Sequence, residues 1–132
     1  MPELVDCACR SGHPDGVCRV SPQMTGEEII ADMAQTFKCL SDPSRLRIIN
    51  ALLISEMCVH TISRVVGMSQ PAVSHHLKQL RQLRLVKCRR KGRAIFYSLS
   101  DYHIQLLFDL SKTHVCEPRE TIEKQAPPRE GN

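Results

Sequence analysis

The sequence has no tryptophan and only five other aromatic residues, two tyrosines and three phenylalanines, so its core must be built mainly from leucine, isoleucine and valine. It also lacks any apolar run near the roughly 18 residues that cross a bilayer, which argues against a membrane protein or a membrane partner. Residues 1–6 show no cationic segment followed by an apolar stretch, so we expect no secretory signal and a cytoplasmic protein. A chain of 132 residues suits a single domain.

Cysteine, in contrast, is abundant. The chain has seven cysteines, and an odd number cannot be fully paired in disulfides within one chain. In a protein without an export signal, thiols stay reduced, so cysteines at this density favour metal or redox chemistry over a disulfide framework.

Acidic side chains are nearly absent from the middle of the chain. Residues 43–98 carry eleven basic residues and one acidic residue, Glu56, so this segment has a net charge of +10 against −6 for the remainder. A basic segment between acidic flanks is typical of a surface that meets a polyanion, although a solvated face of lysine and arginine gives the same charge count. The order of the predicted elements favours the first interpretation.

Three regions differ in composition. Residues 1–24 contain three prolines and two glycines without sustained periodicity, and we expect a flexible arm that carries Cys7, Cys9, His13 and Cys18. Residues 25–117 form the expected ordered domain, and residues 118–132 read as a disordered polar tail.

Four helices are predicted first. A Thr25–Glu28 capping box starts one helix, and Asp42 followed by Pro43 starts the second. A short third helix over about 61–66 stops at Gly67, and Ser69 caps a fourth that runs to about residue 84.

The apolar period then changes to that of strands. Residues 85–90 and 93–99 are predicted strands joined by Lys91-Gly92, and Ser100 is expected to cap a last helix over about 101–117. The predicted fold class is therefore mainly α with a small β-hairpin, a winged helix-turn-helix with a long terminal helix.

The helix-turn-helix predicts DNA binding. Its second helix would enter the major groove by its N-terminal end, where side chains such as glutamine and lysine read base edges and other basic side chains reach phosphates. The candidate base-reading residues are Gln70, Ser74, His75 and Lys78. The candidate phosphate contacts are Arg64, Arg81, Arg84, Arg89, Arg90, Lys91 and Arg93. A helical hairpin used for packing alone would not explain so basic an exposed face.

Four segments together resemble the ArsR/SmtB family of metal-sensing repressors. They are residues 40–49 (LSDPSRLRII), 55–60 (SEMCVH), 69–77 (SQPAVSHHL) and 92–97 (GRAIFY). The resemblance covers about residues 25–117 and implies a homodimer that binds an inverted-repeat operator. It also implies that metal binding releases the DNA and derepresses genes of metal efflux or sequestration, with no organic substrate.

The predicted terminal helix carries two ligand pairs, Asp101 with His103 and His114 with Glu117. The two histidines are separated by a rise of about 16 Å, so one straight helix cannot close a site with bond lengths near 2 Å. Both pairs have their midpoint near residues 108–109, so two antiparallel copies would form two equivalent four-ligand sites about one dyad. Two histidines and two carboxylates favour Zn²⁺, and the pattern resembles the family's interfacial zinc site. The alternative is an ordinary amphipathic helix.

A second, thiol-rich set includes Cys58 and His60, whose side chains would point the same way on an extended or turn backbone just before the third helix. By the family resemblance, cysteines from the partner's N-terminal arm would join them. The available arm residues are Cys7, Cys9 and Cys18, with His13 as a weaker candidate. Such a site suits Cd²⁺, Pb²⁺, Zn²⁺, Cu⁺ or Ag⁺. His60 stands where some members of the family have a second cysteine, which leaves selectivity for lead or cadmium open. The alternative is a flexible arm whose cysteines are incidental.

A thiol-based redox-sensing repressor on the same fold would use Cys7, Cys9 or Cys18 as its switch. The other alternative is a zinc enzyme or a metal carrier. An enzyme is not expected, because the sequence has no H-E-x-x-H motif and no general base apart from the two closed ligand sets.

Overall fold

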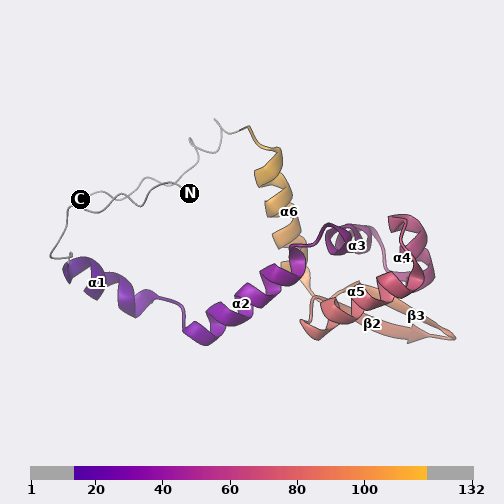
Figure 1. Cartoon of the computed structure of the whole chain (residues 1–132), viewed down its shortest axis with the longest axis horizontal. Helices are drawn as coiled ribbons and strands as arrows, with labels where there is room; N and C mark the ends of the chain where they lie inside the picture. Colours follow the sequence, from indigo (N-terminus) through magenta and orange to yellow (C-terminus); the bar gives the residue numbers. More distant parts are fainter. Residues whose placement is uncertain (1–13, 119–132) are drawn as a thin grey trace. The chain divides into compact units, whose positions relative to one another are not determined.

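The computed structural model describes residues 14–118, in which helices precede and follow a small sheet (Figure 1). The elements are α1 (Pro14–Val20), the 3₁₀-helix η1 (Ser21–Gln23), α2 (Glu27–Leu40), α3 (Pro43–Ile54), β1 (Met57–Cys58), α4 (Val59–Val66), α5 (Gln70–Gln82), β2 (Val86–Lys91), β3 (Ala94–Leu99) and α6 (Tyr102–Cys116). They fall into two units that meet within α2, one up to Gln35 and one from Thr36 onward.

The first unit is more helical than the sequence predicted. Residues 14–23, expected to be part of an irregular arm, form α1 and η1, which are too short to show an apolar period. The α2 helix begins at Glu27 rather than Thr25, because the carbonyl of Gly26 accepts the first intrahelical bond, from the Ile30 amide at 3.0 Å.

In the second unit, the start of α3 confirms the predicted cap. The Asp42 carboxylate accepts hydrogen bonds from the Ser44 and Arg45 amides at 2.7 and 3.3 Å, and Pro43 occupies the first turn. Behind this cap lies a core of aliphatic side chains from α3, α4, α5, β2 and α6. Its most buried members are Ile48, Ile49, Ile62, Val73, Leu77, Leu80 and Val86.

The β-hairpin is confirmed, but it belongs to a sheet of three strands. The order is β1-β3-β2 and all pairs are antiparallel, with Met57 opposite Tyr97 and Val86 opposite Leu99. The β1 strand was not predicted, because a two-residue strand has no period. The predicted hairpin turn is wrong by one residue: Lys91 pairs with Ala94, so the turn residues are Gly92, at φ = 63°, and Arg93.

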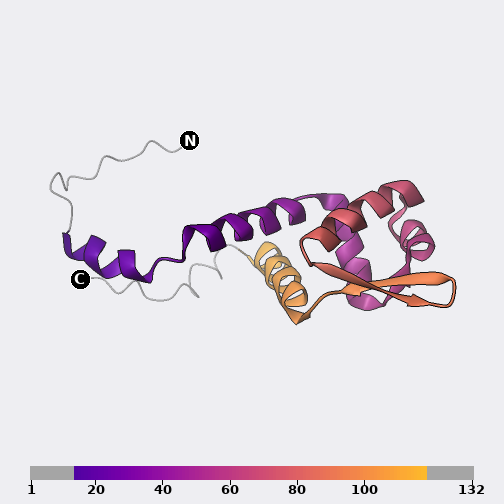
Figure 2. The same cartoon turned by 90° about the horizontal axis from the view of Figure 1, so that it is seen from below.

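The α4–α5 pair followed by this hairpin confirms the predicted winged helix-turn-helix. The hairpin follows α5 in the chain and β2 contacts that helix, so the hairpin forms a wing next to it (Figures 1 and 2). The terminal helix is also confirmed, but Asp101 rather than Ser100 is its cap, since the Asp101 carboxylate accepts from the His103 amide at 2.9 Å. None of the helices within residues 14–118 is long and apolar enough to cross a membrane.

Candidate nucleic-acid interface and metal-ligating residues

The turn between α4 and α5 is fixed by backbone chemistry. Gly67 ends α4 in the left-handed region at φ = 69°, and the Met68 amide then donates to the Ser63 carbonyl at 3.1 Å. Two residues later the Ser69 side chain accepts from the Ala72 amide at 3.3 Å and starts α5. This turn leaves the N-terminal end of α5, which we call the recognition helix, in solvent.

The recognition helix has a buried side and an exposed side. Val73, Leu77 and Leu80 are buried in the core. The candidate DNA contacts are all exposed, on α4, on the recognition helix and just after it, and on the wing and its turn: Arg64, Gln70, Ser74, His75, Lys78, Arg81, Arg84, Arg89, Arg90, Lys91 and Arg93. Their exposure is what a DNA contact requires, and the contact itself stays a prediction.

One basic residue of the wing, Arg89, forms an ion pair within the chain. The Arg89 guanidinium donates two hydrogen bonds to the Glu56 carboxylate, one of them from Nε to Oε2 at 2.7 Å, and lies 5.8 Å from the centroid of the Phe96 ring. The bond from Arg89 lowers the pKa of Glu56, although partial desolvation opposes the shift, and Glu56 in turn raises the pKa of Arg89. A phosphate contact by Arg89 therefore competes with this ion pair.

The terminal-helix ligand pairs lie at opposite ends of α6. Asp101 Oδ1 and His103 Nδ1 are 3.3 Å apart, with 50% and 84% of their side chains exposed. Adjacent ligands of a tetrahedral zinc ion are also about 3.3 Å apart, given bond lengths of about 2.0–2.1 Å, so this pair fits zinc. His114 lies in the last turn, whereas Glu117 is the C-cap, with extended backbone.

Within residues 14–118 of a single chain, no three potential ligands come together as a metal site. The Glu117 amide still donates to the Thr113 carbonyl at 2.9 Å, so Glu117 follows the last turn of α6, and its pairing with His114 as a ligand stays a prediction. A four-ligand site on α6 would therefore need a second chain.

The thiol-rich set is arranged differently from the prediction. Cys58 is extended, but His60 lies in the first turn of α4 rather than before it, so the assumed extended spacing is wrong. Hydrogen bonds from the side chain and backbone of Thr61 lower the pKa of the Cys58 thiol. His60 Nδ1 instead lies 2.9 Å from Gln70 Nε2 on the recognition helix.

Of the predicted arm ligands, only Cys18 lies within the described residues. Cys18 is an exposed residue of α1, in the first unit, and its thiol is free. Cys7, Cys9 and His13 lie outside the described residues, as does the tail beyond Pro118. Participation of the arm in a metal site stays a prediction.

Comparison with known proteins identifies the family to which the chain is similar. The model of a family described as "Bacterial regulatory protein, arsR family" matches residues 42–87. A transcriptional repressor SmtB homolog of Synechocystis is 41% identical over 105 residues, which cover 80% of each chain. A CadC homolog of Staphylococcus aureus, a cadmium resistance transcriptional regulatory protein, is 34% identical over 80% of this chain and 87% of its own.

The chain belongs to the ArsR family of bacterial regulatory proteins.

Solved structures agree with this assignment. The solution structure of apo-NmtR is 35% identical and superposes with a TM-score of 0.60, covering 85% of this chain and 86% of NmtR. A homodimeric winged helix-turn-helix DNA-binding domain from Mycobacterium bovis, described as a possible ArsR-family regulator, has a TM-score of 0.66 at 27% identity, covering 74% and 95% of the two chains. The ArsR-family fold thus spans most of the chain.

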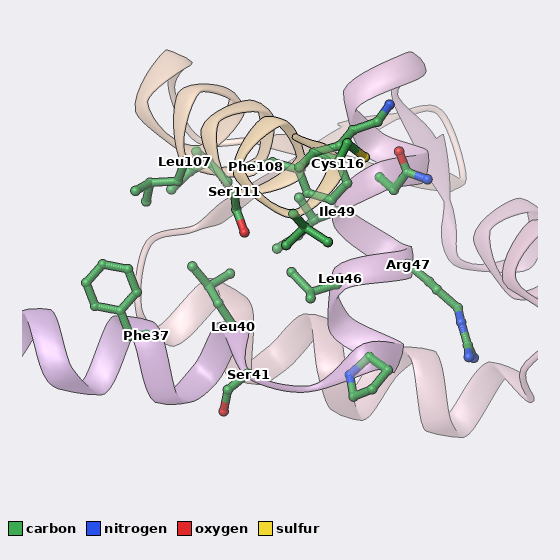
Figure 3. A pocket seen from close by; sticks show the side chains of 15 residues that line it. Phe37, Leu40, Ser41, Leu46, Arg47, Ile49, Leu107, Phe108, Ser111 and Cys116 are labelled. Carbon is green, nitrogen blue, oxygen red and sulfur yellow. The ribbon is translucent and has the colours of Figure 1, made fainter. Parts of the chain in front are cut away.

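This ArsR-family chain has an open apolar cavity of about 770 Å³ between the end of α2, α3 and α6 (Figure 3). Phe37, Leu46 and Phe108 point toward it from the three helices. Phe37 and Leu46 are exposed in the single chain, at 54% and 40%. Sequence reasoning predicts such side chains as core, because periodicity cannot tell a core face from a face that awaits a partner.

Sequence reasoning also missed the role of Arg45 in this ArsR-family fold. It counted Arg45 only as part of the basic segment, yet the side chain is half-buried and donates to Cys39, His76 and Gln79. The same surroundings act on Asp42. Desolvation raises its pKa, but backbone hydrogen bonds from Arg45 and Ser44, with the charge of Arg45, outweigh this and lower it. No periodic pattern signals such a contact.

Proposed function

We propose that this chain is a metal-responsive transcriptional repressor of the cytoplasm that acts on DNA as a homodimer and is not an enzyme. The observation that carries the proposal is a capped recognition helix whose inner side is buried and whose exposed side holds Gln70, Ser74 and Lys78. Glutamine pairs with adenine edges and lysine with guanine or phosphate, so this side suits a major groove. The names of the relatives, SmtB and CadC, support a repressor that senses metal.

Exposed apolar side chains on α6 support the dimer. One stripe along α6 consists of residues spaced three or four apart, namely the leucines Leu106 and Leu110 with a histidine at each end, His103 and His114. Leu106 and Leu110 are 38% and 67% exposed in the single chain. A second α6, antiparallel to the first, would cover these leucines and bring His103 of each chain near His114 of the other.

The metal effector in this proposal is zinc on α6. Asp101 and His103 would hold the ion together with His114 and Glu117 of the second chain, and the bound ion would supply a charge that ties the two helices together. We expect the metal-bound dimer to present its recognition helices less well to two successive major grooves. Thermodynamic linkage then requires metal to bind the DNA-free dimer more tightly, typically by about 1–3 kcal/mol.

A second site at Cys58 and His60, completed by Cys7, Cys9 or Cys18, is proposed for softer ions such as Cd²⁺, Pb²⁺, Cu⁺ or Ag⁺, with Zn²⁺ as an alternative occupant. The lowered pKa of Cys58 supports it, because the thiolate is the form that binds metal. The same lowered pKa would serve a redox sensor, but the relatives' names favour metal sensing.

A mobility-shift experiment tests the proposal. The probe is a duplex containing the inverted repeat that the wild-type protein enriches from a random-sequence library, and Zn²⁺, Cd²⁺, Pb²⁺, Cu⁺ and Ag⁺ are titrated against the complex. Zinc is expected to release DNA from the wild type but not from His114→Ala, whereas Cys58→Ser should alter only the response to soft ions.

Two results would contradict the proposal. Equal zinc affinity of the free and DNA-bound protein would remove the coupling. Release of DNA by oxidant without metal, unaffected by His114→Ala, would favour the redox alternative.

A further inference from the structure

We propose that Arg45 is a positioning residue that holds the recognition helix in the orientation that base reading requires, without contacting DNA itself. The inference rests on the proposed DNA-binding function and says how this chain supports the helix that performs it.

One guanidinium joins three helices. Near the start of α3, Arg45 Nε donates to His76 Nδ1 at 3.2 Å, Nη1 donates to the Cys39 carbonyl at 3.1 Å, and Nη2 donates to Gln79 Oε1. Cys39 is in the last turn of α2, whereas His76 and Gln79 are on the recognition helix. All three nitrogen atoms of the guanidinium are therefore used, each by a different partner.

The Cys39 carbonyl explains why this link is firm. The last carbonyls of a helix have no intrahelical donor and lie at the negative end of the helix dipole. A cationic donor placed there both pairs a carbonyl and is stabilised by the dipole. Cys39 itself is 6% exposed and its sulfur lies 3.6 Å from Arg45 Nη1. Arg45 is thus fixed on one side by the buried corner between α2 and α3.

On its other side Arg45 contacts the recognition helix away from Gln70, Ser74 and Lys78, the exposed residues on which the proposed base reading rests. A helix advances about 100° per residue, so positions 76 and 79 are neighbours on one side, whereas Ser74 and Lys78 lie on another. The guanidinium therefore sets the rotation of the helix about its axis without reaching the DNA side. Lysine could not replace it, because a single ammonium group lacks the planar fork that reaches three acceptors.

A recognition helix that loses this support would still carry its positive charges. Attraction to phosphates is tolerant of small rotations, but hydrogen bonds to base edges are not. Loss of Arg45 should therefore reduce selectivity for the enriched duplex rather than affinity for all DNA. A residue that merely stabilises the fold would not change this ratio in the folded protein.

The experiment measures binding to the enriched duplex and to an unrelated duplex by fluorescence anisotropy over a range of salt concentrations. The variants are Arg45→Lys, Arg45→Met and Gln79→Ala, and the control is Arg47→Met, an exposed arginine on the same helix. We expect each Arg45 or Gln79 variant to bind the enriched duplex about tenfold more weakly, with less than about twofold change for unrelated DNA. Arg45→Lys combined with Gln79→Ala should be no worse than Arg45→Lys alone, because both remove one contact network.

Three outcomes would overturn the inference. If Arg45→Met lowers the slope of log K against log salt by about 0.9, Arg45 contacts a phosphate directly. If the variants keep the wild-type selectivity, Arg45 does not position the helix. If Arg45 variants fail to fold, Gln79→Ala decides, and retained selectivity in that variant contradicts the inference. A wild type that enriches no sequence would instead overturn the proposed function, so the two failures are distinct.

Discussion

Glu56 is the one acidic side chain between residues 43 and 98, and Arg89 of β2 holds it in a bidentate ion pair. The pair neutralises a carboxylate that would repel a polyanion, but it also occupies a cation that could meet one. Charge counting along the sequence predicted the basic surface, but it missed the partners of Arg45 and of Arg89. Side-chain pairing between residues 33 positions apart, as in Glu56 and Arg89, leaves no periodic trace in a single sequence.

Removal of this carboxylate should strengthen DNA binding. In Glu56→Gln the Arg89 guanidinium loses its anionic partner and becomes available for a phosphate. We expect several-fold tighter binding of the enriched duplex at low salt and a salt dependence that steepens by up to about 0.9. Glu28→Gln, an exposed acid on α2, is the matched control, and anisotropy titrations are the measurement. Unchanged or weaker binding by Glu56→Gln would show that the ion pair orders the wing rather than withholding a cation.

The same pair predicts a pH dependence of stability. The pKa of Glu56 is lower in the folded than in the unfolded state, so its ionised carboxylate stabilises the fold. This stabilisation is fully present above the unfolded pKa, near 4.5, and is lost as pH falls through the lowered folded pKa. The melting temperature of the wild type should therefore exceed that of Glu56→Gln at neutral pH, and the difference should disappear as pH falls below 4.5 and through the lowered folded pKa of Glu56. A gap that persists in acid would assign the difference to something other than the ion pair.

At the scale of elements, helix caps were the reliable signal in the sequence. Asp42–Pro43, Gly67 and Ser69 each act in the structure as their chemistry predicts. Errors arose where two adjacent residues could serve equally, as with Ser100 and Asp101, or where an element is too short for a period, as with β1 and α1. Local chemistry therefore fixed the helix starts within one or two residues, whereas short elements depended on tertiary contacts.

The end of the recognition helix shows a departure from the usual cap chemistry. Arg84 has φ = 57°, and the amides of Arg84 and Leu85 donate to the carbonyls of Arg81 and Leu80 at 3.0 and 2.9 Å. This is the arrangement that normally has glycine in the left-handed position. Arg84→Gly should therefore raise the free energy of unfolding by about 1 kcal/mol, as measured by urea denaturation.

Arg81→Gly provides the contrasting control for that experiment. Arg81 is helical, so glycine there should lower the free energy of unfolding by about 1 kcal/mol. Equal signs for the two substitutions would show that the left-handed geometry at Arg84 is not the cause.

At the scale of the whole molecule, the family and the winged helix-turn-helix could be predicted from sequence, because several motifs agreed in order and spacing. The ligand set on α6 could be predicted only as a symmetric spacing, and no single chain tests it. The exposed apolar residues could not be sorted into core and interface, since helical periodicity is the same for both. A second chain is the physical element that the sequence of one chain does not contain.

Dimerisation through α6 can be tested by adding a charge to its exposed stripe. Leu110→Glu replaces a leucine that is 67% exposed in the single chain, so the fold should persist while association is lost. Sedimentation equilibrium should then give the chain mass of 14.9 kDa instead of about twice that value. Gln105→Glu, a charge of the same sign on an exposed polar position of α6, should remain dimeric. A dimeric Leu110→Glu protein would place the interface elsewhere.

The open cavity between the end of α2, α3 and α6 affects how long a newly made, unpaired chain survives in the cell. Until a partner arrives, Leu46, Leu107 and Val115 present an apolar surface of the kind that chaperones and proteases recognise. Solitary subunits would therefore be removed faster than assembled ones. The cellular level of the repressor would then be set by pairing as much as by its rate of synthesis.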